Sequence, residues 1–261
     1  MVQISDIHYD HLPIRIQDAF LDRVIEKVNA LKPDIIVITG DFVQREPEPI
    51  HQLIDKHLNR LKAKYGIYNI LGNHDYKTSH GAELITKAFE KTDMTLLHNQ
   101  VAYPMGKGKG RIQLVGLGDY SRKRVNFLVD QVKESLEEPN RPRIVLSHNP
   151  DSAKDLVEFE IDLQLSGHTH GGQVCFPNGR PILPILDKLM TRILPKRELV
   201  RISYPRKVVK NWEWARGHHI LEQETRPERP FNLYVNRGLA THPPLRLFCD
   251  PEITLILLSP K

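Results

Sequence analysis

The sequence of 261 residues predicts an α/β protein, because strand-like and helix-like segments alternate over its first two-thirds. Residues 35–39, Ile-Ile-Val-Ile-Thr, form a short β-branched run that is typical of a buried strand. Just before this run, apolar residues between Phe20 and Leu31 recur at steps of three and four, which predicts the buried face of an amphipathic helix. The pair Lys32-Pro33 then ends the predicted helix.

The remaining elements follow the same two patterns. Strands are predicted at residues 2–4, 67–71, 112–116, 143–147, 161–165, 231–236 and 253–258, and helices at residues 50–63, 81–91 and 125–137. Residues 107–110, Lys-Gly-Lys-Gly, predict a hairpin turn between strands near 101–105 and 111–116. Residues 177–230 are rich in proline and basic residues, which predicts a long surface excursion or lid. We therefore expect a single domain over residues 1–261 with an elaborated C-terminal third.

The composition is ordinary for a globular protein, with 40% hydrophobic and 26% charged residues. The formal net charge of +5 fits an anionic small molecule, a nucleic acid or an anionic membrane surface, and does not choose among them. Cys175 and Cys249 are the only cysteines and lie far apart, which argues against a disulfide framework and favours the cytoplasm. No apolar run approaches about 18 residues, and no signal peptide precedes the first motif.

Polar residues gather at the downstream ends of five predicted strands, where ligands bind in open α/β sheets. In chain order the motifs are Asp6-Ile7-His8, Gly40-Asp41, Gly72-Asn73-His74-Asp75, Ser147-His148-Asn149 and Gly167-His168-Thr169-His170. Each motif alone is more often a turn, a capped loop or a packed histidine than a ligand site. Five of them, each at a strand end, leave little room for five separate structural explanations, so we expect them to converge in space.

The donor types in these motifs indicate a metal site. Aspartate and asparagine oxygens together with several imidazoles suit manganese, iron or zinc better than calcium or magnesium, and they are numerous enough for two divalent ions. Asp6 and His8 lie two residues apart on a segment that we expect to be extended, so their side chains should point to the same side, and His168 and His170 should do likewise. The glycines at 167, 171 and 172 would let the backbone turn sharply without a side-chain clash.

The ordered set of motifs, which spans residues 4–173, resembles the calcineurin-like metallophosphoesterase family. Three longer stretches narrow the resemblance to its YkuE/YaeI-type phosphodiesterase branch, which often has a membrane-targeted or anchored N-terminus. These stretches are Ser147-His148-Asn149-Pro150-Asp151, the run from Gly167 to Gln173, and Leu233-Tyr234-Val235-Asn236-Arg237-Gly238-Leu239. The resemblance implies a four-layered α/β/β/α sandwich in which helices flank two mixed sheets.

The resemblance also implies a role for each polar side chain. Asp6, His8 and His170 would hold the first ion with Asp41 bridging, and Asn73, His148 and His168 would hold the second. His74 would lie outside the metal shell near the substrate, with Asp75 orienting it. A hydroxide shared by the two ions would attack phosphorus, and His74 would stabilise the developing charge or protonate the leaving group.

We therefore expect a metal-dependent phosphoric ester hydrolase that cleaves phosphodiesters, with phosphomonoesters also within reach of this chemistry. One alternative is the hydrolysis of a lipid-linked pyrophosphate such as UDP-diacylglucosamine at a membrane surface, where the amphipathic stretch from Ile182 to Met190 would contact the bilayer. Another is a nuclease of the same fold, for which the net charge of +5 is weak support. A third is a non-enzymatic scaffold, which predicts missing ligands, whereas all seven candidates are present. We expect a cytoplasmic protein with peripheral membrane contact as an addition, and no specific binding of nucleic acid.

Overall fold

The computed structural model describes residues 1–12, 14–108, 111–120, 125–139, 141–193, 208–223, 225–242 and 245–259. Its strands and α-helices are β1 (Val2–Ile4), α1 (Asp18–Ala30), β2 (Ile36–Thr39), α2 (Pro49–Lys56), β3 (Ile67–Ile70), α3 (Gly81–Phe89), β4 (Thr95–Leu96), β5 (Gln100–Ala102), β6 (Gln113–Gly116), α4 (Lys133–Leu136), β7 (Arg143–Leu146), β8 (Leu163–Ser166), α5 (Leu183–Ile193), β9 (Gly217–Leu221), β10 (Phe231–Val235) and β11 (Thr254–Leu255). Short 3₁₀ helices lie at Leu58–Arg60 (η1), Val129–Gln131 (η2), Pro150–Asp155 (η3), His170–Gly172 (η4) and Trp212–Trp214 (η5).

The strands form two mixed sheets. The first sheet has the order β11-β1-β2-β3-β4, in which β1 to β4 run parallel and β11 is antiparallel to β1. The second sheet has the order β5-β6-β7-β8-β10-β9, with a parallel centre and antiparallel strands at both edges. Because the central strands of each sheet are parallel, the loops that follow them leave from one edge of that sheet.

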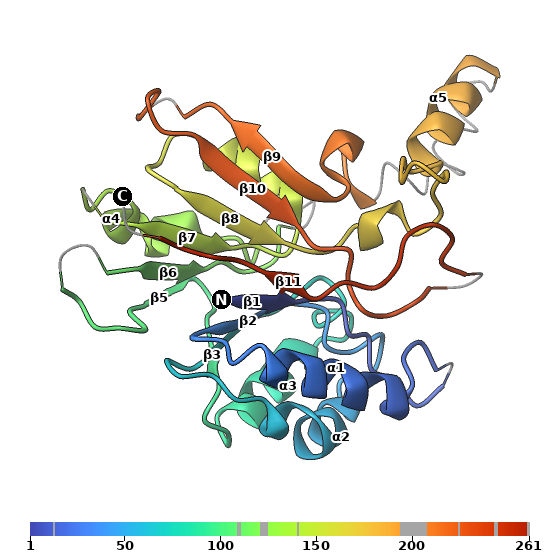
Figure 1. Cartoon of the computed structure of the whole chain (residues 1–261), viewed down its shortest axis with the longest axis horizontal. Coiled ribbons are helices and arrows are strands. Elements are labelled where there is room, and N and C mark those ends of the chain that lie inside the picture. Colours follow the sequence, from blue (N-terminus) through green and yellow to red (C-terminus); the bar gives the residue numbers. More distant parts are fainter. Residues whose placement is uncertain are drawn as a thin grey trace.

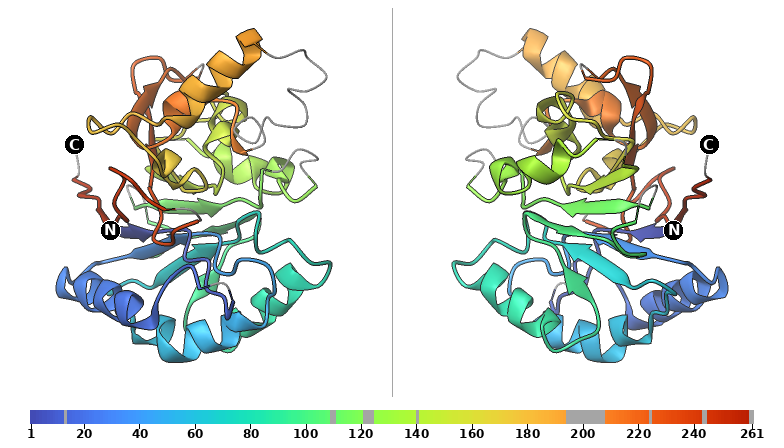
Figure 2. Two further views of the ribbon diagram at one scale, coloured as in Figure 1. Left: turned by 90° about the vertical axis from the view of Figure 1, so that its right-hand side faces the viewer. Right: turned by 90° about the vertical axis from the view of Figure 1, so that its left-hand side faces the viewer.

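Each sheet packs against the other sheet on one face and against helices on the opposite face, which produces four layers (Figures 1 and 2). Ile36 and Ile38 of β2 pack into a cluster with α1, α2 and α3, whereas Val37 between them packs with residues of the second sheet. On the far face of the second sheet, Val145 and Leu233 pack against η2, α4 and η3. The α/β/β/α sandwich expected from the sequence is therefore confirmed. The strands β1, β2, β3, β6 and β7 are buried on both faces.

Two of the predicted helices are much shorter than expected, and in both cases a tertiary contact interrupts the pattern. The helix predicted at 125–137 contains only η2 and α4, because Asn99 holds the segment before them by hydrogen bonds to Asn126 O and Leu128 N. The helix predicted at 50–63 ends at Lys56, where the ring of His57 turns towards Asp18 and Asp22 of α1.

The segment expected to be a lid is partly structured. It contains α5, η5 and β9, and β9 extends the second sheet as an edge strand. Residues 194–207 of this segment, and Lys109-Gly110 of the predicted hairpin turn, lie outside the described residues. Figure 1 shows α5 projecting from the body of the molecule. Among the described residues, no helix combines the length and the apolar character needed to cross a bilayer.

Candidate metal centre

The five predicted motifs meet where the loops of the two sheets face each other. Asp41, which follows β2, lies at the centre of this meeting point. Its Oδ2 is 3.4 Å from Nε2 of His8, which follows β1, and 3.2 Å from Nε2 of His148, which follows β7. The expectation that loops scattered along the sequence converge in space is therefore confirmed.

One cluster of donors joins Asp41 to the histidines of the second sheet. Nδ1 of His168 lies 3.2 Å from Nε2 of His148, and ligand atoms of these two residues and Asp41 all lie within 4.8 Å of one another. Oδ1 of Asn73 is buried and has no hydrogen-bond partner among the described residues. These residues are the ones that the family resemblance assigned to the second ion.

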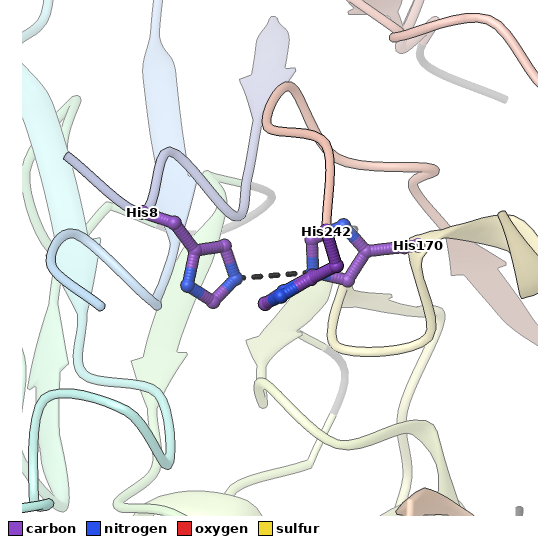
Figure 3. Close-up of side chains that lie close together, drawn as sticks. All are labelled: His8, His170 and His242. Carbon is purple, nitrogen blue, oxygen red and sulfur yellow. Dashed lines mark hydrogen bonds between the residues drawn. The ribbon is translucent and has the colours of Figure 1, made fainter. Parts of the chain in front are cut away.

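A second cluster lies on the other side of Asp41, and Figure 3 shows the three rings that form it. Nε2 of His8 is 3.0 Å from Nε2 of His170, and Oδ1 of Asp6 is 3.8 Å from the former and 3.5 Å from the latter. The third ring belongs to His242, whose Nε2 is 3.2 Å from Nε2 of His170. This cluster contains the set expected for the first ion together with a histidine that the sequence analysis missed.

The backbone at this site is held in an unusual conformation. Nine non-glycine residues of the described chain have positive φ, and five of them are predicted ligands. Their φ angles are 53° at Asp6, 45° at His8, 55° at Asp41, 71° at His168 and 50° at His170. The expectation of an extended Asp6–His8 segment is therefore wrong, although both side chains do reach the same site. Left-handed backbone at non-glycine residues costs about 1–3 kcal/mol each and is concentrated at functional sites, so this strain is itself an argument for a ligand-holding role.

Two glycines permit the close approach of the loops. A Cβ atom at Gly167 would lie 2.3 Å from Oδ2 of Asp6, so no other residue fits at this position without moving the carboxylate. Gly171 has a φ of 63°, and a Cβ there would lie 2.8 Å from Sγ of Cys249. The sharp turns predicted for the Gly-His-Thr-His-Gly-Gly motif are therefore confirmed.

Backbone carbonyl groups orient the imidazole rings. Nδ1 of His148 contacts Thr39 O at 2.7 Å, and Nε2 of His168 contacts Val208 O at 2.8 Å. A carbonyl only accepts, so each of these nitrogens carries a proton, and the other ring nitrogen, which lies towards Asp41, is the one that would bind a cation. Nδ1 of His170 lies 3.3 Å from both Ala240 O and Nη2 of Arg246. Such partners fix the ring orientation of metal-binding histidines.

Asp75 acts on the backbone of the neighbouring loops, not directly on His74. Its Oδ2 accepts hydrogen bonds from the N–H groups of Asp41 and Gly72 at 3.0 and 2.8 Å, and its Oδ1 accepts from those of Phe42 and Val43 at 2.9 and 3.2 Å. Burial and the Asp41 carboxylate raise the pKa of Asp75 to about 8, but a proton on either oxygen would face two N–H donors, so the carboxylate is the form that fits. The expected contact with His74 is replaced by a contact of the His74 ring with Gln44 O.

His74 lies beside the two clusters with both of its ends fixed. Its Nδ1 is 2.7 Å from Gln44 O, and its backbone N–H donates to Oδ1 of Asp41 at 2.8 Å. Its ring packs edge-on against His8 with a centroid separation of 4.7 Å. The ring is half-buried, which leaves an edge open to a substrate.

The electrostatics of the site favour neutral rings at His8, His168 and His170, and an imidazolium at His148 beside the ionised carboxylate of Asp41. Burial lowers the pKa of His8 and His170 well below the ordinary value, and burial together with His148 lowers the pKa of His168 to about 4. Burial also opposes charge on His148, but the Asp41 carboxylate outweighs it and raises the pKa of His148 to about 10. The surrounding imidazoles hold the pKa of Asp41 well below its usual range despite burial.

These residues fit divalent cations. Nitrogen atoms of neighbouring rings lie 3.0 Å apart in one cluster and 3.2 Å apart in the other, which is about the separation of two ligands on one cation. Buried Oδ1 of Asn73 and Nδ1 of His8 have no hydrogen-bond partner among the described residues. The mixture of imidazole and carboxylate donors matches transition metals.

The sequence analysis missed two groups of the site, the carboxyl group of Asp119 and the imidazole of His242. Asp119 follows β6, is 2% exposed and interacts electrostatically with His148 and Asp41. His242 lies seven positions beyond the end of β10 at Val235. Both β6 and β10 are parallel strands of the second sheet, so an inspection of every strand end would have found Asp119, whereas His242 lies too far along its loop for this signal.

Taken together, a four-layered sandwich and a cluster of carboxylate and imidazole donors at the carboxyl ends of its strands define a metal-dependent hydrolase. Residues 1–172 match the family model described as calcineurin-like phosphoesterase, so the chain belongs to this family. It is a phosphoric ester hydrolase, and its family membership implies divalent metal ions.

Several proteins resemble the chain over most of its length. The UDP-2,3-diacylglucosamine pyrophosphatase LpxG of Chlamydia trachomatis is 31% identical, and the alignment covers 98% of this chain and 82% of that protein. The phosphodiesterase YaeI of Escherichia coli is 28% identical, with 98% and 80% covered. An uncharacterized metallophosphoesterase of Campylobacter jejuni, Cj0846, is 37% identical, with 100% and 59% covered.

Solved structures support the fold. The 5'-nucleotidase precursor of Thermus thermophilus superposes with a TM-score of 0.53 at 14% identity, over 91% of this chain and 48% of that one. This likeness concerns the fold alone.

Proposed function

We propose that the chain hydrolyses phosphodiester bonds at a centre that holds two divalent cations, with manganese, iron or zinc as the metal. The position of Asp41 carries this proposal. Its carboxylate lies between the two donor clusters, with Oδ2 at 3.4 Å from His8 Nε2 and 3.2 Å from His148 Nε2. A carboxylate suits a bridging position because its two oxygens and its negative charge offset two cations.

The ligands that we assign are those predicted from the sequence. Asp6, His8 and His170 would hold one ion, Asn73, His148 and His168 the other, and Asp41 would serve both. When bound, two such ions supply a water of lowered pKa and neutralise charge on the phosphoryl oxygens. The backbone contacts of Asp75 would keep Asp41 and the loop of Asn73 in place without reorganisation during the reaction.

His74 is the residue that we assign to proton transfer. Because Nδ1 donates to Gln44 O, the proton available for the reaction is the one at Nε2. In its doubly protonated form His74 can pass this proton to the leaving oxygen, and in either form the ring can contact a phosphoryl oxygen. The Gln44 carbonyl stabilises the Nδ1–H and so keeps the ring aimed.

Metal analysis combined with a hydrolysis panel tests the proposal. We expect two ions per chain in protein loaded with manganese, and turnover of bis-p-nitrophenyl phosphate. His74→Asn should keep both ions and lose about a hundredfold in kcat, whereas His80→Asn, an exposed histidine on the same loop, should change neither. A wild type that binds both ions and hydrolyses nothing would support the scaffold alternative, and activity confined to single-stranded DNA would indicate a nuclease.

A lipid-linked pyrophosphate is the second candidate substrate, and exposed apolar side chains on α5 and on the segments that follow His170 and His242 favour it. On α5, Ile185, Leu186, Leu189 and Ile193 are exposed at helical spacing, so they form one stripe on the projecting helix. The start of α5 is tied to residue 174 by the hydrogen bond from Ile182 N to Val174 O.

Exposed apolar residues also lie where the segment before α5 meets the segment after His242. Val174 pairs with Leu247, and next to this pair Phe176 and Phe248 are 40% and 54% exposed. Exposed Arg180 and Arg192 accompany the apolar residues, as expected for contact with an anionic bilayer. The relative from Chlamydia is named for a lipid-linked pyrophosphate, and we infer that this chain acts on the same class of substrate while in peripheral contact with a membrane.

Flotation with vesicles of phosphatidylglycerol and phosphatidylcholine tests the membrane contact. The double variant Leu186→Asp/Leu189→Asp should lose binding and also lose activity towards a diacylated nucleoside-diphosphate sugar, while it keeps activity towards bis-p-nitrophenyl phosphate. Leu31→Asp is a matched control, because Leu31 is 43% exposed at the end of α1 in another layer. Equal flotation of all three proteins would exclude α5 as a membrane contact.

A further inference from the structure

We propose that His242 donates a hydrogen bond from Nε2–H to a phosphoryl oxygen of the substrate, and that Arg15 and Gln173 fix its ring for this purpose. The inference rests on the proposed function, since it concerns the same site. His242 is the ring that joins His8 and His170 in Figure 3, and it arises from the loop after β10. Its Nε2 lies 3.2 Å from Nε2 of His170, so this nitrogen faces the reacting centre.

Arg15 determines which nitrogen of His242 carries the proton. Nη1 of Arg15 lies 3.0 Å from Nδ1 of His242. A guanidinium group only donates and does not lose its proton, so Nδ1 must accept, and the proton of the neutral ring is then on Nε2. Nδ1 of His170 has two neighbours at 3.3 Å, the carbonyl of Ala240, which accepts, and Nη2 of Arg246, which donates. As a ligand of a cation, His170 would donate Nδ1–H to this carbonyl and present the lone pair of Nε2. The two neighbouring rings therefore present opposite groups to the centre: a lone pair from His170 and an N–H from His242.

The backbone of His242 is fixed by Gln173, which ends the stretch from Gly167 that contains His168 and His170. Oε1 of Gln173 accepts from the N–H of His242 at 2.7 Å, and Nε2 of Gln173 donates to the carbonyl of His242 at 2.7 Å. The adjacent Thr241 N–H donates to Arg15 O at 3.1 Å. Gln173 thus links the loop of His170 to the loop of His242, which gives this glutamine a role that the metal ligands alone do not explain.

A donor at this position suits phosphoryl transfer better than a further metal ligand. A metal ligand needs a lone pair on the nitrogen that faces the ion, and the contact with Arg15 places a proton there. The guanidinium of Arg15 occupies the acceptor at Nδ1, so the ring keeps its single proton, and with it the donor, at Nε2. A preorganised N–H donor directed at developing oxygen charge stabilises the transition state.

The closing experiment compares His242→Met, which removes the donor, with His242→Gln, which places an amide N–H near the former Nε2. Wild type and variants are loaded with manganese, and the metal content, kcat and KM with bis-p-nitrophenyl phosphate and the binding of inorganic phosphate are measured. We expect two ions in every protein, a fall in kcat of about a hundredfold and weaker phosphate binding in His242→Met, and partial recovery in His242→Gln. His51→Met, an exposed histidine on α2, is the control and should match the wild type.

Three outcomes would overturn the inference. Loss of one ion in His242→Met would make His242 a metal ligand, and unchanged kinetics with both ions retained would leave it without a role. If His242→Met does not fold, Arg15→Met is used instead. In this variant kcat should be lower, and ¹⁵N spectra of the histidines should show that His242 has left the Nε2–H tautomer. An unchanged tautomer would contradict the role of Arg15. A wild type inactive towards every phosphoester would count against the proposed function, and not specifically against His242.

Discussion

The two sheets contribute different chemistry to the same centre. The loops of the first sheet supply most of the oxygen donors. Their backbone is fixed by Asp75, which accepts hydrogen bonds from four backbone N–H groups of these loops. The loops of the second sheet supply imidazoles that are held by backbone carbonyl groups, among them Thr39 O and Val208 O. The contacts of Asp75 stay within the loops of the first sheet, whereas the imidazoles of the second sheet depend in part on Thr39 of the first.

This difference shows how the centre is held together. Thr39 belongs to the first sheet and orients His148 of the second, and Asp6 of the first sheet accepts from the backbone N–H of His168 at 3.0–3.1 Å. Each half therefore positions ligands of the other half. We infer that the site forms only when both sheets have docked, and that changes in the first sheet should disturb both halves.

The largest effect is expected from Asp41→Asn, which tests whether one carboxylate joins the two halves. The substitution removes the negative charge between His8 and His148. We expect the loss of at least one ion and a fall in kcat of about a thousandfold, measured by metal analysis and hydrolysis of bis-p-nitrophenyl phosphate. Asp55→Asn on the exposed side of α2 is the control. Full metal content with near-normal turnover would show that the halves bind their ions independently.

A smaller effect on activity and a clear effect on stability are expected from Asp75→Asn. The amide nitrogen would replace an oxygen that accepts two N–H donors, so one pair of donors in the first-sheet loops would lose its acceptor. We expect a loss of about 2–4 kcal/mol in the free energy of unfolding and a fall in kcat, both measured with the metal-free and the manganese-loaded protein. An unchanged denaturation midpoint would contradict the view that Asp75 organises these loops.

The same contrast explains how much the sequence could predict. The residues of the first-sheet site follow their strands within a few positions, so Asp6, Asp41 and Asn73 are recognisable from strand-end motifs. His242 and Val208 are brought to the site by long loops and by contacts with Arg15 and His168 that no local pattern encodes. Short apolar, β-branched runs likewise predicted the strands, but the pattern failed for the helix at 125–137, where the side chain of Asn99 competes for backbone groups.

The smallest effect, on the pH dependence of stability, is expected at Asp119. This carboxyl group follows β6 and lies beside the histidines of the second sheet. Burial, opposed by His148 and reinforced by Asp41, raises the pKa of Asp119 to about 6, whereas the imidazoles hold the pKa of Asp41 well below its usual range. A carboxyl group whose pKa is raised on folding stabilises the native state below its unfolded pKa of 3.8, and this contribution is lost as the pH rises through about 6.

Asp119→Asn removes this titration and so tests whether the second-sheet carboxyl group is held in a protonated form. In chelated protein, the free energy of unfolding of the variant relative to the wild type should increase by about 2.4 kcal/mol between pH 4 and pH 7 and stay nearly constant above pH 7. Urea unfolding at a series of pH values measures the difference, with Asp130→Asn as an exposed control on η2. Parallel curves for the variant and the wild type would mean that Asp119 is ionised in the folded protein, as Asp41 is, and the two sheets would then not differ in the charge state of their carboxyl groups.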